Sequence, residues 1–465
     1  MRELPRALFD IYALALPRGH GFGSNPPIGA WQSDDGLAYA VVTRHVSSGD
    51  FGHLAFRRRV DHVWSKTAEG RGLRSMDEVL RQLDPLLRSD QAAEPMPQNT
   101  APRRALYDFG SRNPSDVFRV LTTPSHHVAT WTLNQLYLSL PKPDKNWASD
   151  CQTGNFHTRL WEVQLLASFR EQGLLVTQPK LSPDFRIENR LGGEAWVEAV
   201  TANPVESYNH VNSPPSYQPE ARDELFFGPA AVRFAKTLGS KLQRQYDKLP
   251  HVAGKPFMIA LADFHAPASM VWSREALIGY LYGLRADAVE IDGERVAVAS
   301  YVTHLLGASA FQAGLFRNDE HAELSAVIFS NACSISKFSR VPVTAGAGTK
   351  NFRYVRFGNF FDTAPGALKG IPFCLDITSD EYRKLWPQGY EPWSAELEVF
   401  HNPFARYPMP LELLPEATHW LEVEGELINS PYYDTSVLWS QTWILDEDAR
   451  MPTLADFLLN TETEK

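Results

Sequence analysis

The stretch LLVTQPKLSPDFRIENRLGGEAWVEAVT, residues 174–201, decides the fold, because three short extended runs follow one another within it. LLVTQPK and DFRIEN come first, and LGG at 191–193 then turns the chain into EAWVEAVT. A glycine-containing turn between two extended runs is typical of adjacent strands. We therefore expect the second and third runs to lie side by side in a sheet.

Helices flank this stretch on both sides. FHTRLWEVQLLASFREQG, residues 156–173, predicts an amphipathic helix that ends at Gly173. AAVRFAKTLGSKLQRQYDKL, residues 230–249, predicts a second helix, and GKPFMIALADF, residues 254–264, predicts a strand that is buried on both faces. The order helix, three strands, helix, strand indicates an α/β fold in which helices flank a mixed sheet.

The remaining chain is less regular. Residues 38–45 and 53–64 predict a strand pair, and Ser75 can cap a helix that follows. The Pro- and Ala-rich residues 89–104 form the best linker candidate. We expect four parts: a strand-rich segment with a helix at 1–95, a linker and lead-in at 96–150, the α/β core at 151–270, and an α+β part at 271–465 that extends the same unit or forms an accessory domain.

Composition limits the function classes. The formal charge is −10 over 465 residues, whereas a protein that coats nucleic acid nonspecifically is normally basic, so only a local basic cleft remains compatible with nucleic-acid binding. The chain has three cysteines and no CxxC pair, which excludes a disulfide framework and a four-cysteine zinc site. No apolar run approaches the roughly 20 residues of a membrane span. We expect a soluble, cytoplasmic protein.

Three carboxylates fall where a charge is costly. Glu162 projects from the apolar side of its helix, Asp184 follows Pro183 at the start of a strand, and Glu198 lies within AWVEAVT on the face of Trp196. A buried carboxylate needs a metal ion or a hydrogen-bond donor. A chance "PD" before an "Exx" strand is common, so the combination of three acids, element order and faces is what indicates a site.

SPDF at 182–185 with WVEAV at 196–200 resembles the signature of the PD-(D/E)xK, or restriction-endonuclease-like, nuclease superfamily. The resemblance covers about a quarter of the chain. It implies an αβββαβ core in which Asp184 and Glu198 hold Mg²⁺ or Mn²⁺, and Glu162 assists as a third acid. The chain departs from the signature at the lysine position, which is Val200.

A displaced cation is therefore expected. In this superfamily the lysine commonly migrates to the following helix, which makes Lys241 the first candidate, beside the apolar stripe of that helix. Gln245 lies one turn further on, and Lys180 precedes the PD motif as a second candidate. The alternatives are that either lysine is a solvated surface residue or that the site binds without catalysing.

The second half of the chain offers two further candidate site residues and a second resemblance. Asp263 and His265, at the end of the last core strand, could line the cleft or join a metal site, although a histidine there is more often a turn residue. Several stretches of the second half, including SKLQRQY and SAVIFSN, are similar to uncharacterised bacterial proteins. That similarity supports a single extended unit and carries no activity.

The sequence thus predicts a metal-dependent endonuclease that hydrolyses phosphodiester bonds, with DNA as its partner and a role in bacterial defence or genome maintenance. The main rival is a nuclease-fold protein without catalysis that serves as a binding or assembly subunit, alone as a homo-oligomer or with a partner protein. A weaker rival is a paired-carboxylate hydrolase acting on glycans, which would need two acids across a groove.

Overall fold

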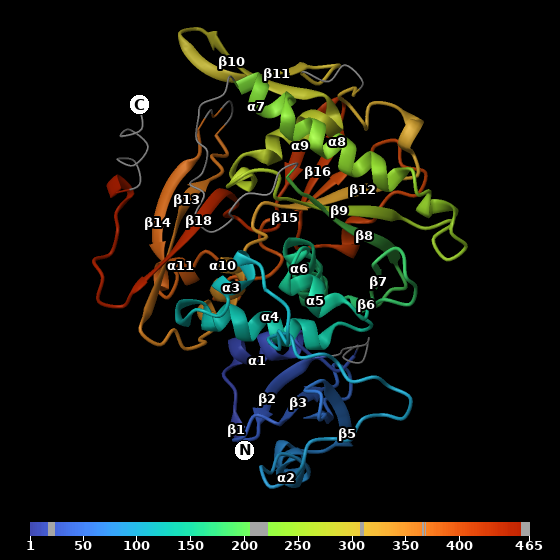
Figure 1. The fold of residues 1–465 in the computed structure, drawn as a ribbon, viewed down its shortest axis with the longest axis vertical. Helices are drawn as coiled ribbons and strands as arrows, with labels where there is room; N and C mark the ends of the chain where they lie inside the picture. The colour runs from blue at the N-terminus through green and yellow to red at the C-terminus, as the bar shows by residue number, and fades with distance from the viewer. Residues whose placement is uncertain (17–23, 205–221, 307–310, 365–366, 368, 457–465) are drawn as a thin grey trace.

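The computed structural model describes residues 1–16, 24–204, 222–306, 311–364, 367 and 369–456. An N-terminal sheet occupies one end of the molecule, and a larger α/β unit occupies the rest (Figure 1). The larger unit contains the stretch 174–201 with Asp184 and Glu198, and also Glu162 and Asp263. In the described part, no helix is both long and apolar enough to cross a membrane.

The N-terminal sheet is an antiparallel meander in the order β1-β2-β3-β4-β5. Its strands are β1 (Arg2–Glu3), β2 (Pro27–Gln32), β3 (Ala38–Arg44), β4 (Phe51–Arg58) and β5 (Trp64–Leu73). Helix α2 (Met76–Leu86) packs on one face, and the Ser75 side chain caps it by accepting a bond from the Glu78 amide at 3.2 Å. The predicted pair β3–β4 and the Ser75-capped helix are confirmed.

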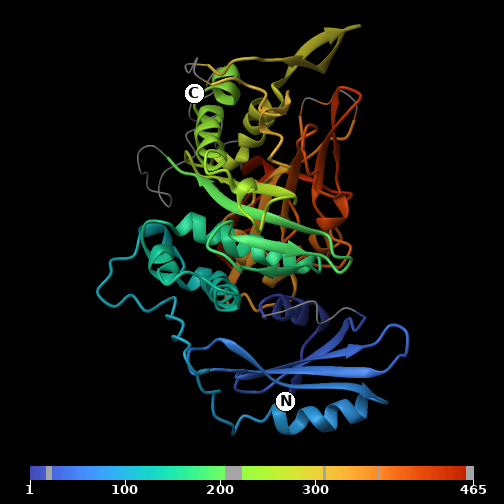
Figure 2. The ribbon, with the colours of Figure 1, turned by 90° about the vertical axis from the view of Figure 1, so that its right-hand side faces the viewer.

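Helix α1 (Arg6–Leu14) lies between this sheet and the larger unit (Figure 2). Its Phe9 side chain packs into the core of the N-terminal sheet, whereas Ile11 and Leu14 pack into the main core of the larger unit. Arg170 donates to the Leu14 carbonyl at 3.1 Å. One short helix is therefore shared by two hydrophobic cores.

The larger unit is built on an eight-stranded mixed sheet in the order β17-β16-β15-β12-β9-β8-β7-β6. The strands are β6 (Leu175–Thr177), β7 (Phe185–Glu188), β8 (Glu194–Ala202), β9 (Phe257–Asp263), β12 (Ala326–Ser330), β15 (Leu397–His401), β16 (Thr418–Val423) and β17 (Glu426–Ser430). The pairs β8–β9, β9–β12 and β15–β16 are parallel, and the other pairs are antiparallel. The C-terminal part of the chain therefore contributes β12, β15, β16 and β17 to this sheet.

Helices cover both faces of this sheet. They are α4 (His127–Ser139), α5 (Trp147–Gln152) and α6 (Phe156–Glu171) on one face, and α7 (Arg222–Phe227), α8 (Pro229–Leu242) and α9 (Ser273–Tyr282) on the other (Figure 1). Leu166 of α6 packs with Ala260, and Phe234 of α8 packs with Ile259, because successive residues of β9 point to opposite faces. The predicted α/β class with a mixed, helix-flanked sheet is confirmed.

Residues 96–150 are more than the expected linker and lead-in. Residues 96–115 contain no helix or strand, but α3 (Asp116–Val120) and α4 follow, and Leu133 and Leu136 of α4 are buried in the main core. A helix that is apolar on several sides belongs inside a fold. This stretch is therefore part of the larger unit.

Two smaller sheets complete the described chain. One has the order β14-β13-β18, formed by β13 (Phe352–Phe360), β14 (Ile371–Asp376) and β18 (Val437–Asp446), near helices α10 (Ile335–Thr344) and α11 (Asp380–Arg383). The other is the hairpin β10 (Leu284–Ile291) and β11 (Glu294–Tyr301), which projects from the body in both ribbon views (Figures 1 and 2).

Candidate active site at the β7–β8 hairpin

The β7–β8 hairpin brings Asp184 and Glu198 close together. The two strands are antiparallel, and the Asp184 Oδ2 atom accepts a bond from the Ala199 amide at 2.8 Å. The turn is held by Asn189, whose Oδ1 accepts from the amides of Leu191 and Gly193 at 3.0 and 2.8 Å. The adjacent strands expected from the LGG turn therefore form, and we call Asp184 and Glu198 the acid pair.

Glu198 receives two donors on a single oxygen. Its Oε1 lies 2.6 Å from the Lys241 Nζ and 2.7 Å from the hydroxyl of Tyr246. Its Oε2 is buried and has no hydrogen-bond partner among the described residues, in a side chain that is only 5 % exposed. A buried carboxylate oxygen without a donor is costly, so this oxygen is available to a ligand.

Lys241, the first candidate for a displaced lysine, lies in the last turn of α8 and contacts Glu198. Gln245, in contrast, does not contact the acid pair. Helix α8 ends at Leu242, and Gln245 is an exposed residue with a left-handed φ of 52°. That backbone reversal directs the next side chain, Tyr246, at Glu198, and Arg244 donates to the Tyr246 hydroxyl at 3.3 Å.

Glu162 enters from α6, on the other face of the sheet, and it is already bound. Its Oε2 accepts from the Trp147 indole at 2.6 Å, and its Oε1 lies 2.8 Å from Arg159. Arg159 also pairs with Asp144 and Asp150, each at 2.8 Å. Glu162 is thus neutralised within its own network, unlike the open third acid that the resemblance implied.

The acids nevertheless share one electrostatic environment. Burial, followed by the negative charges of Glu198 and Glu162, raises the pKa of Asp184 to about 8, and the opposing effect of Lys241 is smaller. Like charges in a poorly solvated region oppose ionisation in this way. The Asp184 carboxyl therefore keeps its proton at neutral pH unless a further positive charge joins the acid pair.

The acid pair fits a divalent cation with two protein ligands. Within the ranges that the structure covers, no three Asp, Glu, His or Cys side chains are arranged to hold a metal ion. Mg²⁺ commonly binds through one or two carboxylates and keeps several waters. A positive charge at this place would give the Glu198 Oε2 atom a partner and would lower the pKa of Asp184.

The remaining candidates lie away from the acid pair. Lys180 is exposed in the loop before Asp184, and among the described interactions it forms no hydrogen bond or ion pair. Asp263 is fully buried at the end of β9, where it accepts from the His265 ring at 2.8 Å. Since Glu198 pairs with Ile259, Asp263 lies four residues, or roughly 13 Å, further along the sheet.

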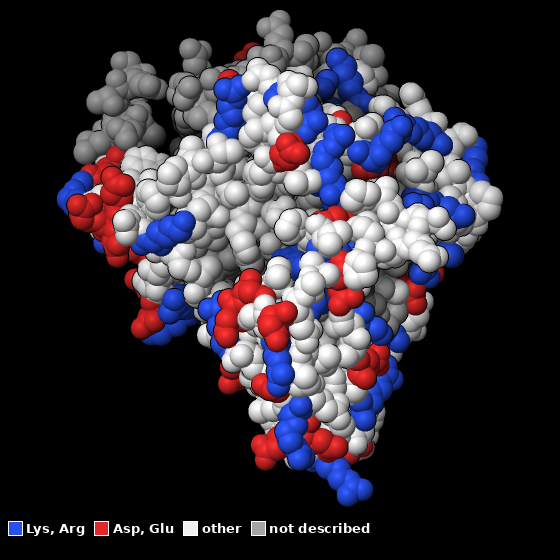
Figure 3. All heavy atoms as spheres, turned by 60° about the horizontal axis from the view of Figure 1, so that its bottom comes forward, with Lys and Arg blue, Asp and Glu red and all other residues white. Residues whose placement is uncertain are grey.

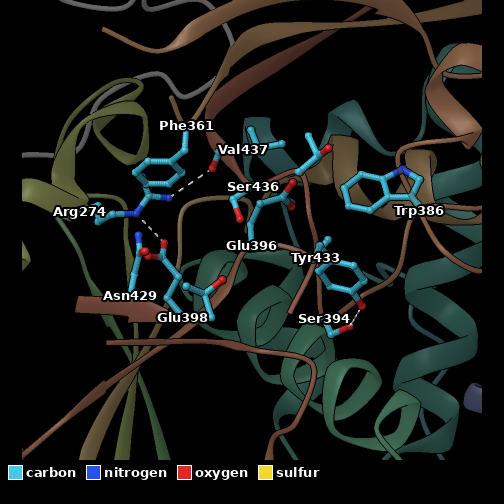
Figure 4. Close-up of a pocket in the computed structure, with 13 residues that line it drawn as sticks. Arg274, Phe361, Trp386, Ser394, Glu396, Glu398, Asn429, Tyr433, Ser436 and Val437 are labelled. Atoms are coloured by element: carbon cyan, nitrogen blue, oxygen red, sulfur yellow. Dashed lines mark hydrogen bonds and ion pairs between the residues drawn. The ribbon is translucent and has the colours of Figure 1, made fainter. Parts of the chain in front are cut away.

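A separate cavity is lined by residues of α9, β15, β16, β17 and β18 and of nearby loops (Figure 4). Arg274 spans its wall, donating to Glu398 at 2.6 Å and to the Leu438 carbonyl at 2.9 Å, with Phe361 over its guanidinium. Its free volume is about 20 Å³. A space of that size holds one water molecule and is too small for a substrate.

Comparison of the chain with protein-family models, with curated proteins and with solved structures gives no match in any of the three. The resemblance to PD-(D/E)xK nucleases therefore stays a prediction that rests on the residues and their geometry.

Proposed function

We propose that this chain is a metal-dependent nuclease that hydrolyses phosphodiester bonds in DNA at the acid pair. The observation that carries the proposal is the contact between Lys241 and Glu198, 2.6 Å long. The motif lysine is replaced by Val200, and a lysine from the following helix reaches the same carboxylate. Two acids and a cation thus meet on one hairpin edge.

Each side chain has a distinct role in this proposal. Asp184 and Glu198 would hold Mg²⁺ or Mn²⁺, which when bound supplies charge neutralisation and lowers the pKa of a coordinated water. Tyr246 fixes the Glu198 carboxylate through Oε1 and leaves Oε2 for binding. Lys241 would donate to the developing negative charge on the phosphate, as a preorganised donor in a poorly solvated site.

A second function is favoured by one specific observation. Glu162 is bound by Arg159 and Trp147, so only two acids remain for a cation. A nuclease-fold protein that binds nucleic acid or a partner protein without cutting would tolerate such a reduced site. This binding subunit would not bind a divalent cation at the acid pair. Its binding of nucleic acid or of a partner protein would also stay the same when the acids are replaced.

The test is cleavage of supercoiled plasmid and of single-stranded DNA with Mg²⁺ or Mn²⁺. Asp184→Asn, Glu198→Gln and Lys241→Gln are each expected to lower the rate by at least about 100-fold. Asp90→Asn and Lys384→Gln serve as matched controls, because both side chains are exposed on other elements. Wild-type protein that neither cuts nor binds Mn²⁺ would favour the binding subunit, and controls that lose activity equally would remove the assignment of the site.

A further inference from the structure

A run of cations follows the site helix. Residues 229–255 contain six lysines and arginines and one acid, Asp247, in a chain whose formal charge is −10. Figure 3 shows lysines and arginines gathered on the side of the molecule where Figure 1 places α8 and strands β6 to β8. We call Arg233, Lys236, Arg244 and Lys248 the basic ridge.

The ridge cations form no direct ion pairs within the part of the chain that the structure describes, although Arg244 lies in the field of Glu198 and Asp184. Lys236, Arg244 and Lys248 are exposed and Arg233 is half-buried, and in the described ranges none of the four forms an ion pair with a carboxylate. The Nε of Arg233 is buried without a hydrogen-bond partner there. Most other cations near the β7–β8 hairpin are paired, as Arg186 and Lys255 are with Glu194. Four neighbouring cations without direct ion pairs repel one another and attract an anion.

The ridge leads directly to the acid pair. Arg233, Thr237 and Lys241 lie at positions i, i+4 and i+8 of α8, so they follow one row of the helix surface. At its inner end, Arg244 contacts the Tyr246 hydroxyl, which itself donates to Glu198. A polyanion bound along the ridge would therefore reach the acid pair.

The length of the ridge fits a polymer of phosphates. At about 1.5 Å per residue, α8 extends on the order of 13 Å from Arg233 to its end at Leu242, two residues before Arg244. Successive phosphates of one DNA strand advance about 3.4 Å along the duplex axis, so this length spans four or five of them. A single small anion would use only one or two of the cations.

We propose that the basic ridge binds the phosphate backbone of double-stranded DNA and aligns it with the acid pair. The choice of partner rests on the proposed function, but the binding itself needs neither metal nor cleavage. Backbone contacts of this kind position a duplex without reading its sequence.

The test measures binding of a fluorescein-labelled 20-base-pair duplex by anisotropy, in EDTA and over a range of salt concentrations. The ridge variant Arg233→Gln/Lys236→Gln/Lys248→Gln is expected to bind at least about 10-fold more weakly at low salt, with a salt slope reduced by about 2.7, or 0.9 per lost contact. The matched control Arg74→Gln/Arg81→Gln/Arg88→Gln removes three exposed charges around α2 and should bind like wild type. Lys236→Gln/Lys248→Gln, in which both positions are exposed, provides a second variant if the half-buried Arg233 affects folding.

The outcomes separate the two proposals. Ridge variants that bind like wild type, or lose no more than the control, overturn the ridge, as does wild-type protein that binds phosphatidylserine vesicles but no duplex. Asp184→Asn/Glu198→Gln in EDTA should still bind through the ridge. Ridge-dependent binding without any cleavage would support the ridge proposal and reject the nuclease proposal. Cleavage at the same rate in wild type and in the ridge variants would support the nuclease proposal and reject the ridge proposal.

Discussion

Two groups of buried charges in this chain have opposite electrostatic outcomes. The first is the acid pair with Lys241. The second, which we call the buried ion cluster, consists of Lys337, Arg340, Arg356, Glu391 and Glu396, all at most 3 % exposed. In the buried ion cluster Arg356 lies 2.6 Å from Glu396, and Arg340 lies 3.0 Å from Glu391.

The number of cations explains the difference. Burial alone would raise the pKa of Glu391, but the charges of Arg340, Arg356 and Lys337 outweigh it and hold that pKa at about 2. At the acid pair, burial and the neighbouring acids raise the pKa of Asp184 to about 8. The fold thus neutralises two deeply buried acids in one place and leaves Asp184 without an ion pair among the described residues. A local loss of stability of this kind is common at functional sites.

The largest expected effect comes from opening the buried ion cluster. Arg356→Met should lower the free energy of unfolding by about 3–5 kcal/mol, because it leaves Glu396 buried with less compensation. Denaturant unfolding followed by circular dichroism measures this loss. Arg353→Met is the matched control on the same strand, since Arg353 is 28 % exposed, and it should cost less than about 1 kcal/mol. Equal losses of the free energy of unfolding in both variants would mean that the buried ion cluster does not depend on Arg356 more than the surface depends on Arg353.

At the acid pair, a substitution is expected to raise the free energy of unfolding instead of lowering it. Folded Asp184 keeps its proton up to about pH 8, whereas the unfolded chain releases it near the ordinary value of 3.8. This carboxyl therefore contributes its full stability below pH 4, and the contribution is lost as pH rises through 8. Asp184→Asn removes that loss, so in metal-free buffer it should be more stable than wild type at pH 9.

The measurement is the difference in melting temperature between Asp184→Asn and wild type at pH 4.5, 7 and 9. That difference should grow with pH, while exposed Asp90→Asn should give a difference that stays flat. A difference that shrinks toward pH 9 would show that Asp184 is stabilised as a carboxylate, and the comparison between the two charge groups would fail.

The smallest effect concerns the donors on Glu198. Tyr246→Phe removes the 2.7 Å bond to Oε1 and leaves Lys241, so the free energy of unfolding should fall by about 1 kcal/mol. Tyr432→Phe, at a side chain that is 51 % exposed, should change it by much less. If Tyr246→Phe costs as much as Arg356→Met, the acid pair is as tightly organised as the buried ion cluster.

Local patterns made much of this architecture predictable. The helix, three strands, helix and strand order follows from periodicity and glycine turns, and the position of Lys241 beside Leu238 follows from helical geometry. Val197 and Glu198 lie on opposite faces as alternation requires. These features depend on residues that are close in sequence.

What sequence reasoning missed depends on backbone breaks and long-range packing. Tyr246 replaced Gln245 at the site because helical spacing no longer applies after α8 ends at Leu242. The pairing of Glu162 with Trp147 required α5 to fold against α6. The apolar spacing of Leu133 and Leu136 is a signal in the sequence that could have identified residues 127–139 as a core helix within the expected linker and lead-in.

Helix α1 gives this fold an order of assembly. Phe9 finds its partners in the first 64 residues, but the Leu14 carbonyl meets Arg170 only 156 residues later. A ribosome that adds roughly 5–20 residues per second needs on the order of ten to thirty seconds to make that interval. During that time the Leu14 carbonyl lacks the donor that Arg170 supplies in the folded chain.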